Sequence, residues 1–235
     1  MEIFISLRPL MTSPAPLILS LESATTTCGV ALHKAGLPLV VMEHHLTRSH
    51  GKNLPLMVQR VLELANVEIK QLNAIAVSSG PGSYTGLRIG VSMAKGLCFG
   101  ARLPLISIES MENLLYSRIN YPQQKGGWYG LLDAGNGRAY GRLVNDTGDL
   151  LATHCCLVEK KQLSNLLATS KITFLGSGAD LHLQLIASLP GASIILGCQP
   201  SVKAMGMLAY KRYQAKEFVD LVNFSPPYLS AREIS

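Results

Sequence analysis

A glycine-rich segment from Ser79 to Gly90 has the residue types of a phosphate-binding turn. It follows an apolar run, Ile75 to Val77, and its glycines let a phosphate or another chain approach the backbone closely. A P-loop would end in Lys-Ser or Lys-Thr, and this segment lacks both. A dinucleotide-binding fingerprint needs its third glycine three residues after its second, whereas Gly82 and Gly86 are four apart. The spacing therefore excludes both common phosphate motifs.

Two acidic residues, Glu22 and Asp133, each end an apolar strand and precede a small polar turn. Carboxylates in such turns can ligate a nucleotide-bound magnesium ion. With Thr25, and with Gly176 and Gly178 after a later apolar run, they form a candidate nucleotide site of a stand-alone ATPase or small-molecule kinase. The alternative is that the glycine pair makes an ordinary turn, and both interpretations stay open.

Three histidines, His44, His45 and His50, allow a second alternative, a metal-dependent peptidase. The chain contains no His-Glu-x-x-His, and in an extended segment His44 and His45 would point to opposite faces. Its five cysteines show no Cys-x-x-Cys spacing, which argues against zinc sites and disulfide frameworks. We therefore expect no metal site and reduced, mostly buried thiols in a cytoplasmic protein.

The 235 residues suffice for one domain or two small ones, and 48% of them are hydrophobic, enough for a sizeable core. No apolar run is long enough for a membrane span, so we expect no membrane partner. The net charge of +6 permits a nucleic-acid partner, and direct tRNA binding through the basic residues of 203–216 is a third alternative. We expect residues 1–16 to form a disordered extension, with Met11 an alternative start.

The order of apolar runs predicts an α/β chain built twice. Strands 17–21, 28–33 and 40–43 form a meander that ends its first strand in an acid, and the same pattern recurs about 110 residues later. We expect two lobes, each with a mixed sheet flanked by helices. The predicted boundaries are 17–118 for the N-terminal lobe, 119–198 for a smaller C-terminal lobe, and 199–235 for a helix and tail that pack back on the first lobe.

The predicted helix from Tyr84 to Gly100 carries two unusual rows. Small residues recur every fourth position at Gly86, Gly90 and Ala94, and such a bare face is usually occupied by a close neighbour. That neighbour is either a partner protein or the chain's own sheet. A second, apolar row on another face of this helix is formed by Ile89, Met93 and Leu97. One face of the predicted helix 49–66 is also apolar, formed by Leu54, Met57 or Val58, and Val61.

Several of these segments together resemble one protein family. Residues 19–25, 80–90 and 94–97, with Asp133-Ala134 and Tyr140, resemble the bacterial TsaB (YeaZ) family, which belongs to the Gcp-like proteins once labelled glycoproteases. The resemblance implies the duplicated actin-like ATPase fold (ASKHA, ribonuclease H-like). It also implies a subunit of the complex that forms N6-threonylcarbamoyladenosine in tRNA, with the catalytic paralogue TsaD and the ATPase TsaE as partners.

Further expectations follow from the resemblance. The helices 49–66 and 84–100 would pack against TsaD, or against a second copy when TsaD is absent, which makes both rows above candidate interface residues. ATP or ADP with magnesium would bind, if at all, at that junction, and tRNA would be engaged indirectly. Ser110 and Leu114 align without gaps with the metal-binding histidines of TsaD, so we expect a non-catalytic subunit. Glu22 replaces the family's usual aspartate, which argues against autonomous ATP hydrolysis.

Overall fold

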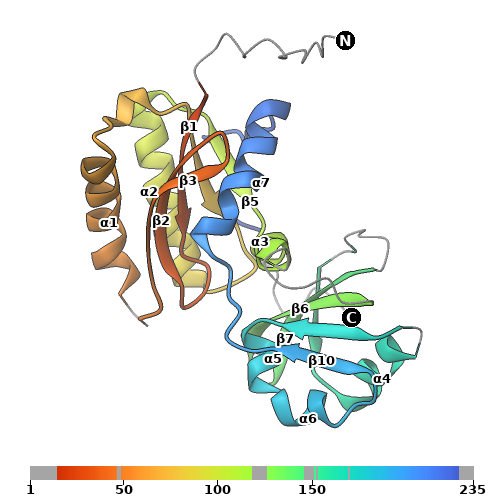
Figure 1. The fold of residues 1–235 in the computed structure, drawn as a ribbon. Coiled ribbons are helices and arrows are strands. Elements are labelled where there is room, and N and C mark those ends of the chain that lie inside the picture. The colour runs from red at the N-terminus through yellow and green to blue at the C-terminus, as the bar shows by residue number, and fades with distance from the viewer. Residues whose placement is uncertain are drawn as a thin grey trace, which may run out of the picture.

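The computed structural model describes residues 15–46, 49–117, 126–145, 151, 153–168 and 170–227. The predicted extension lies almost wholly outside these residues. The first lobe contains a sheet of order β3-β2-β1-β4-β5 (Figure 1). Its strands are β1 (Leu17–Glu22), β2 (Cys28–Lys34), β3 (Leu37–His44), β4 (Ala74–Ser78) and β5 (Leu105–Ile108). The first three pair antiparallel and β4 and β5 join in parallel, so the predicted meander is confirmed.

The second lobe repeats this topology strand for strand. Its sheet has the order β10-β9-β6-β7-β8, with β6, β7 and β8 antiparallel and β9 and β10 parallel to β6. The strands are β6 (Gly127–Gly135), β7 (Arg138–Val144), β8 (His154–Leu157), β9 (Ile172–Leu175) and β10 (Ala192–Ile195). Two sheets of equivalent strand order confirm the duplicated α/β architecture that the repeated acid-ended meanders predicted.

Helices cover both faces of the first sheet. On one face lie α1 (His50–Ala65) and α2 (Tyr84–Ala101), which bury residues such as Leu54 and Val91 over β1, β2 and β4. On the other face lies α7 (Val202–Ala215), whose Val202 and Met205 pack against Ile18 of β1. The chain therefore returns from the second lobe to complete the first (Figure 1).

The helix α3 (Ser110–Tyr116) packs between the two lobes. Its Leu114 and Leu115 form one cluster with Trp128 and Leu175 of the second sheet. An ion pair from Glu109, at the start of α3, to Arg142 of β7 also joins the lobes. This packing positions the cleft described below.

The helices of the second lobe are short. They are α4 (Lys160–Leu167), α5 (Ser177–Leu181) and α6 (Leu183–Ala187). The first lobe also contains a short 3-10 helix, η1 (Ile69–Gln71). The helices α5 and α6 are separate, because the chain leaves helical geometry at His182 between them. Within the described residues, no helix combines the length and apolarity that crossing a bilayer requires.

Candidate functional site

The glycine segment packs directly on the turn between β1 and β2. A Cβ at Gly82 would lie 2.1 Å from the Ala24 carbonyl oxygen, and one at Gly86 would lie 2.1 Å from the Ser23 carbonyl oxygen. The Ser83 amide donates to the same Ala24 oxygen at 2.6 Å. These glycines are needed because two backbone segments meet there without room for side chains. Close packing within the chain, rather than a phosphate, explains this sequence signature.

The bare stripe of α2 faces the same turn and the chain's own sheet. A Cβ at Gly90 would lie 2.1 Å from Ser23 Oγ and 3.6 Å from Val77, and Ala94 is fully buried in the core. The hypothesis that the stripe receives a partner protein is therefore wrong, and its neighbour is the chain itself. On α1, Leu54, Met57 and Val61 are buried in the same core, so they do not offer a surface either.

The second row of α2 remains accessible. Ile89, Met93 and Leu97 are partly exposed. Ile89 also packs close to α1, because its Cδ1 would lie 3.7 Å from a Cβ added at Gly51. Beside this row, Gly96 and Gly100 have no atom within 4 Å of an added Cβ. The bare surface of α2 that stays accessible is therefore at Gly96 and Gly100, on a different face from the buried stripe Gly86, Gly90 and Ala94.

Glu22 is fully buried at the end of β1. Its Oε1 accepts a hydrogen bond from the Ala24 amide at 2.8 Å, and its Oε2 accepts one from Asn113 of α3 at 2.9 Å. Burial away from water raises the pKa of this carboxyl from 4.5 to about 7. Glu22 therefore joins β1 to the helix between the lobes and does not line the cleft, which corrects its assignment as a nucleotide contact.

A cleft of about 1000 Å³ opens between the two lobes. The first lobe contributes the β1–β2 turn, the start of α1 and the start of α2, and the second contributes the end of β6 and the start of α5. Of the candidate nucleotide residues, Thr25 and Asp133 line it. Gly176 and Gly178 instead pack on Leu131 of β6, with a Cβ at Gly176 only 2.2 Å from its carbonyl oxygen. The glycine pair is an ordinary packed turn.

Sequence reasoning missed most of the polar lining. Asp180 lies in the first turn of α5 and accepts a hydrogen bond from the Gly197 amide at 3.1 Å. Its position just after the glycine pair was the only available signal. Hydroxyl groups supply most of the other polar side chains of the lining, from Thr25, Thr26, Ser83, Tyr84, Thr85, Tyr140 and Ser177, and His50 and Gln199 add an imidazole and an amide.

The described lining of the cleft offers no cationic side chain for the phosphates of a nucleoside triphosphate. Among the described lining residues the charged side chains are Asp133 and Asp180, and no lysine or arginine is present. Phosphates are held by cationic side chains, by metal ions and by open backbone amides, yet the Ser83 amide is already bonded to Ala24. The two carboxylates and the hydroxyls are donors that suit a hard cation such as magnesium.

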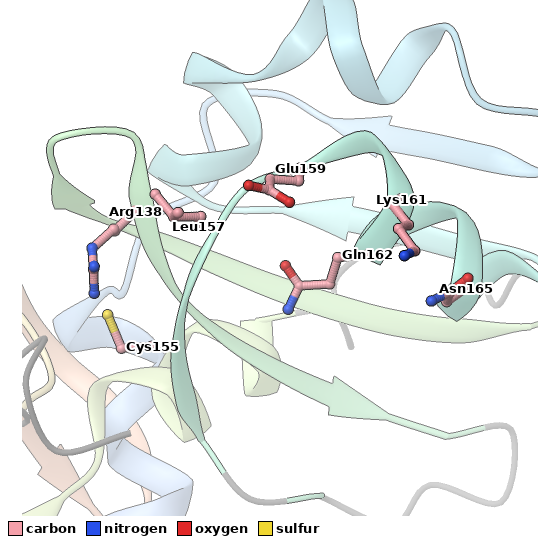
Figure 2. A pocket seen from close by; sticks show the side chains of 7 residues that line it. All are labelled: Arg138, Cys155, Leu157, Glu159, Lys161, Gln162 and Asn165. Atoms are coloured by element: carbon pink, nitrogen blue, oxygen red, sulfur yellow. The ribbon is translucent and has the colours of Figure 1, made fainter. Parts of the chain in front are cut away.

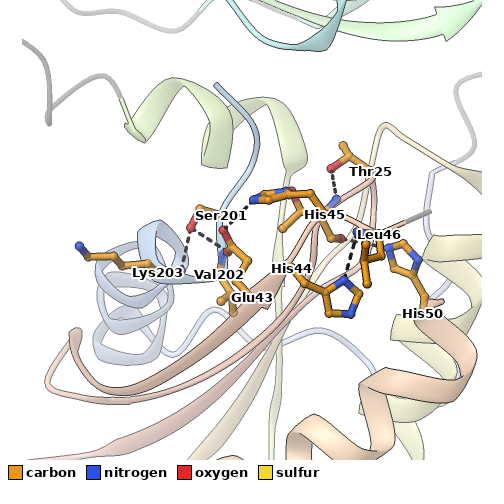
Figure 3. Close-up of polar contacts among 10 residues, drawn as sticks. Thr25, Glu43, His44, His45, Leu46, His50, Ser201, Val202 and Lys203 are labelled. Atoms are coloured by element: carbon orange, nitrogen blue, oxygen red, sulfur yellow. Dashed lines mark hydrogen bonds and ion pairs between the residues drawn. The ribbon is translucent and has the colours of Figure 1, made fainter. Parts of the chain in front are cut away.

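The histidines do not form a metal centre. Figure 3 shows the ring of His45 lying toward Glu43 and the start of α7, while the ring of His44 is directed elsewhere. His44 bonds to Asn53 at 3.0 Å, and His50 bonds to the Thr27 carbonyl oxygen at 3.0 Å. Nowhere in the described part of the chain do three His, Cys, Asp or Glu side chains gather to hold a metal ion.

A second cavity, of about 460 Å³, lies in the second lobe between β8 and α4 (Figure 2). Arg138 and Cys155 lie at one end and Lys161 and Asn165 at the other. It is separate from the cleft, and none of the residues predicted from the sequence lines it.

Comparison with known proteins identifies the family. The family model of TsaD, tRNA N6-adenosine threonylcarbamoyltransferase, matches residues 41–188, more than half of the chain. The chain belongs to this family. It is 28% identical over 223 residues to TsaB of Haemophilus influenzae, covering 90% of this chain and 92% of that protein. It is 27% identical to TsaB of Bacillus subtilis, covering 92% and 95%.

The fold also has solved counterparts. YeaZ from Pseudomonas aeruginosa superposes with a TM-score of 0.76 at 22% identity, covering 91% of this chain and all of that one. The resemblance of the sequence to the TsaB (YeaZ) branch of the family is thereby confirmed, and the shared fold accounts for the two equivalent lobes.

Proposed function

We propose that this chain takes part in the biosynthesis of N6-threonylcarbamoyladenosine in tRNA, as a non-catalytic subunit that forms a heterodimer with TsaD and works with TsaE. The observation that carries the proposal is similarity over about nine-tenths of the chain to proteins named for this pathway. A subunit role fits a cleft whose own charges do not suit a nucleotide.

The geometry of α3 supports a non-catalytic role. Ser110 and Leu114, which align with the metal-binding histidines of TsaD, are both fully buried. Leu114 packs in the cluster between the lobes, and neither residue lines the cleft. A leucine has no lone pair with which to ligate a metal, so this helix stabilises the lobe contact here.

The accessible surface of α1 and α2 is the proposed contact with TsaD, and with a second copy when TsaD is absent. Ile89, Met93 and Leu97 supply apolar area, and Gly96 and Gly100 allow close approach of a facing helix. A nucleotide would bind where the cleft meets the partner, because the partner could supply the phosphate contacts that this chain lacks.

Co-purification with TsaD of the same genome tests the proposal, with Gly96→Arg as the diagnostic variant. The new side chain enters open space, so the fold should tolerate it while the surface is blocked. Ala215→Arg, at an exposed position near the end of α7, is the matched control. We expect the wild type and the control to recover TsaD and Gly96→Arg to lose it.

Two outcomes separate the parts of this proposal. Wild-type chain that fails to recover TsaD refutes the subunit role, whereas recovery by Gly96→Arg refutes only the assigned surface. Gly90→Leu would not serve, because its side chain would collide with Ser23 in the core and any loss of binding could reflect misfolding.

Rival functions have their own measurements. ATP turnover by the isolated chain at the level reached with TsaD present would support a stand-alone ATPase. Cleavage of a glycoprotein by pure protein, lost on His45→Ala, would support a peptidase. Engagement of tRNA is expected to be indirect: Arg212 is already paired with Glu112 of α3 at 2.5 Å, which leaves Lys203, Lys211 and Lys216 of that group for a nucleic acid.

A further inference from the structure

The second sheet ends in a free edge at β8. Within the described residues, β8 pairs with β7 on one side and with no strand on the other. Only alternate residues of an antiparallel edge strand bond to their neighbour, so the remaining amides and carbonyls of His154–Leu157 point away from the sheet. Such an edge is a template for another strand.

The cavity of about 460 Å³ lies along this edge (Figure 2). Cys155 and Leu157 of β8 line it with Arg138, which pairs with Leu157 across the sheet. Because side chains alternate between the faces of a sheet, these three lie on the face opposite Ala139. Ala139 is buried on the other face in one cluster with Leu163 of α4. A cavity lined both from the first face and from α4 therefore lies at the rim of the sheet, beside β8.

We propose that this cavity, the β8–α4 groove, binds an extended acidic segment of a partner protein, which adds to β8 as a further strand. A groove between an edge strand and a helix suits this mode of binding, because main-chain hydrogen bonds to the edge supply affinity and side-chain contacts supply specificity. β8 has four residues, so the matching part of the segment is about 14 Å long.

The charges of the groove favour an acidic segment. The lining contains two cationic side chains, Arg138 and Lys161, and one carboxylate, Glu159, so its net charge is positive. Gln162 and Asn165 add amide groups that can donate to carboxylates or to backbone carbonyls. A basic segment would meet like charges and would be disfavoured.

Strand addition would divide the side chains of the segment between two surroundings. One set would face Leu157, which is 46% exposed, and the buried Cys155, so apolar side chains are expected there. The alternate set would face α4, which contributes the charge of Lys161 and the amide of Asn165 (Figure 2). The expected motif therefore alternates acidic and apolar residues.

A pair of capped synthetic peptides, Glu-Val-Glu-Val-Glu and Lys-Val-Lys-Val-Lys, tests the charge argument on the full-length protein. We expect the acidic peptide to bind at least about tenfold more tightly than the basic one. Binding of the acidic peptide should also slow hydrogen exchange of the amides of His154–Leu157, because their free side would then be paired.

Two N-methylated forms of the acidic peptide test strand addition itself. One form is methylated on the valine amides and the other on the glutamate amides. Alternate amides of an added strand face the edge, so one form should lose binding and the other should keep it. Loss by both forms, or by neither, overturns strand addition.

A matched pair of variants locates the site. Lys161→Glu reverses a charge in the groove, whereas Lys171→Glu reverses one at an exposed lysine outside the groove, before β9. Both lysines are exposed, so neither change disturbs the core. We expect Lys161→Glu to weaken binding of the acidic peptide at least about tenfold and Lys171→Glu to leave it unchanged.

Other results overturn the proposal. These are no binding of the acidic peptide, equal effects of the two variants, or tighter binding of a uridine homopolymer with the same dependence on Lys161, which would make a nucleic acid the occupant. The groove lies in the second lobe, whereas the contact proposed for TsaD is on α1 and α2 of the first. Recovery of TsaD therefore reports separately on the proposed function.

Discussion

Replacing Glu22 with glutamine should make the protein more stable above neutral pH. The carboxyl is fully buried, with its two oxygens bonded to the Ala24 amide and the Asn113 side chain. Desolvation opposes its ionisation and outweighs these hydrogen bonds, so the pKa rises from 4.5 to about 7 in the fold. An uncharged isostere avoids that penalty.

The sign and size follow from linkage. Because the folded pKa lies above the unfolded value, the folded state holds the proton more tightly, and stability is fully present below pH 4.5 and is lost as pH rises through about 7. A rise from 4.5 to about 7 corresponds to about 3 kcal/mol of unfolding free energy lost by pH 8.5. Glutamine cannot ionise, so Glu22→Gln should lack this loss.

The neighbouring groups can accommodate the amide. Asn113 Oδ1 has no hydrogen-bond partner among the described residues, so a flipped Asn113 side chain could accept from the new glutamine NH₂. Urea unfolding at pH 5.0 and 8.5 provides the measurement, with Glu68→Gln, an exposed change, as the control. Parallel pH profiles for the wild type and Glu22→Gln would refute the reasoning, since they would show that Glu22 does not titrate differently in the fold.

Three further outcomes are expected. Gly82→Ala should lower the unfolding free energy by about 2 kcal/mol or more, since its Cβ would collide with the Ala24 carbonyl. Gly96→Ala should raise the unfolding free energy by up to about 1 kcal/mol, because its Cβ enters open space in a helix. Urea titration of both variants measures the two changes. Burial lowers the pKa of His33 from 6.5 to about 4, so stability should fall by about 3 kcal/mol as pH drops from 6.5 to 4, and a flatter acid limb in His33→Gln would confirm the cause. Millimolar ATP with magnesium should leave the thermal midpoint of the isolated chain unchanged within about 1 °C, and a larger rise would contradict the charge argument for the cleft.

The sequence alone determined the elements and their duplication. Alternating apolar runs located the strands of both meanders, and the period of the segment 49–66 located α1 within one residue at each end. These signals are local, because side-chain direction repeats every two residues in a strand and every 3.6 in a helix. The recurrence of an acid at the end of β1 and of β6 was enough to predict two equivalent lobes.

Only the tertiary structure shows which residues contact the small-residue row of α2 and which contact Glu22. The row Gly86, Gly90 and Ala94 showed that something lies close to α2, but the sequence could not say that this neighbour is Ser23 of the same chain. The sequence suggested that Glu22 lines the cleft, but in the structure it is buried and accepts a hydrogen bond from Asn113, 91 positions later. Both decisions depend on how distant segments pack, and a residue's burial is set by that packing rather than by its own type.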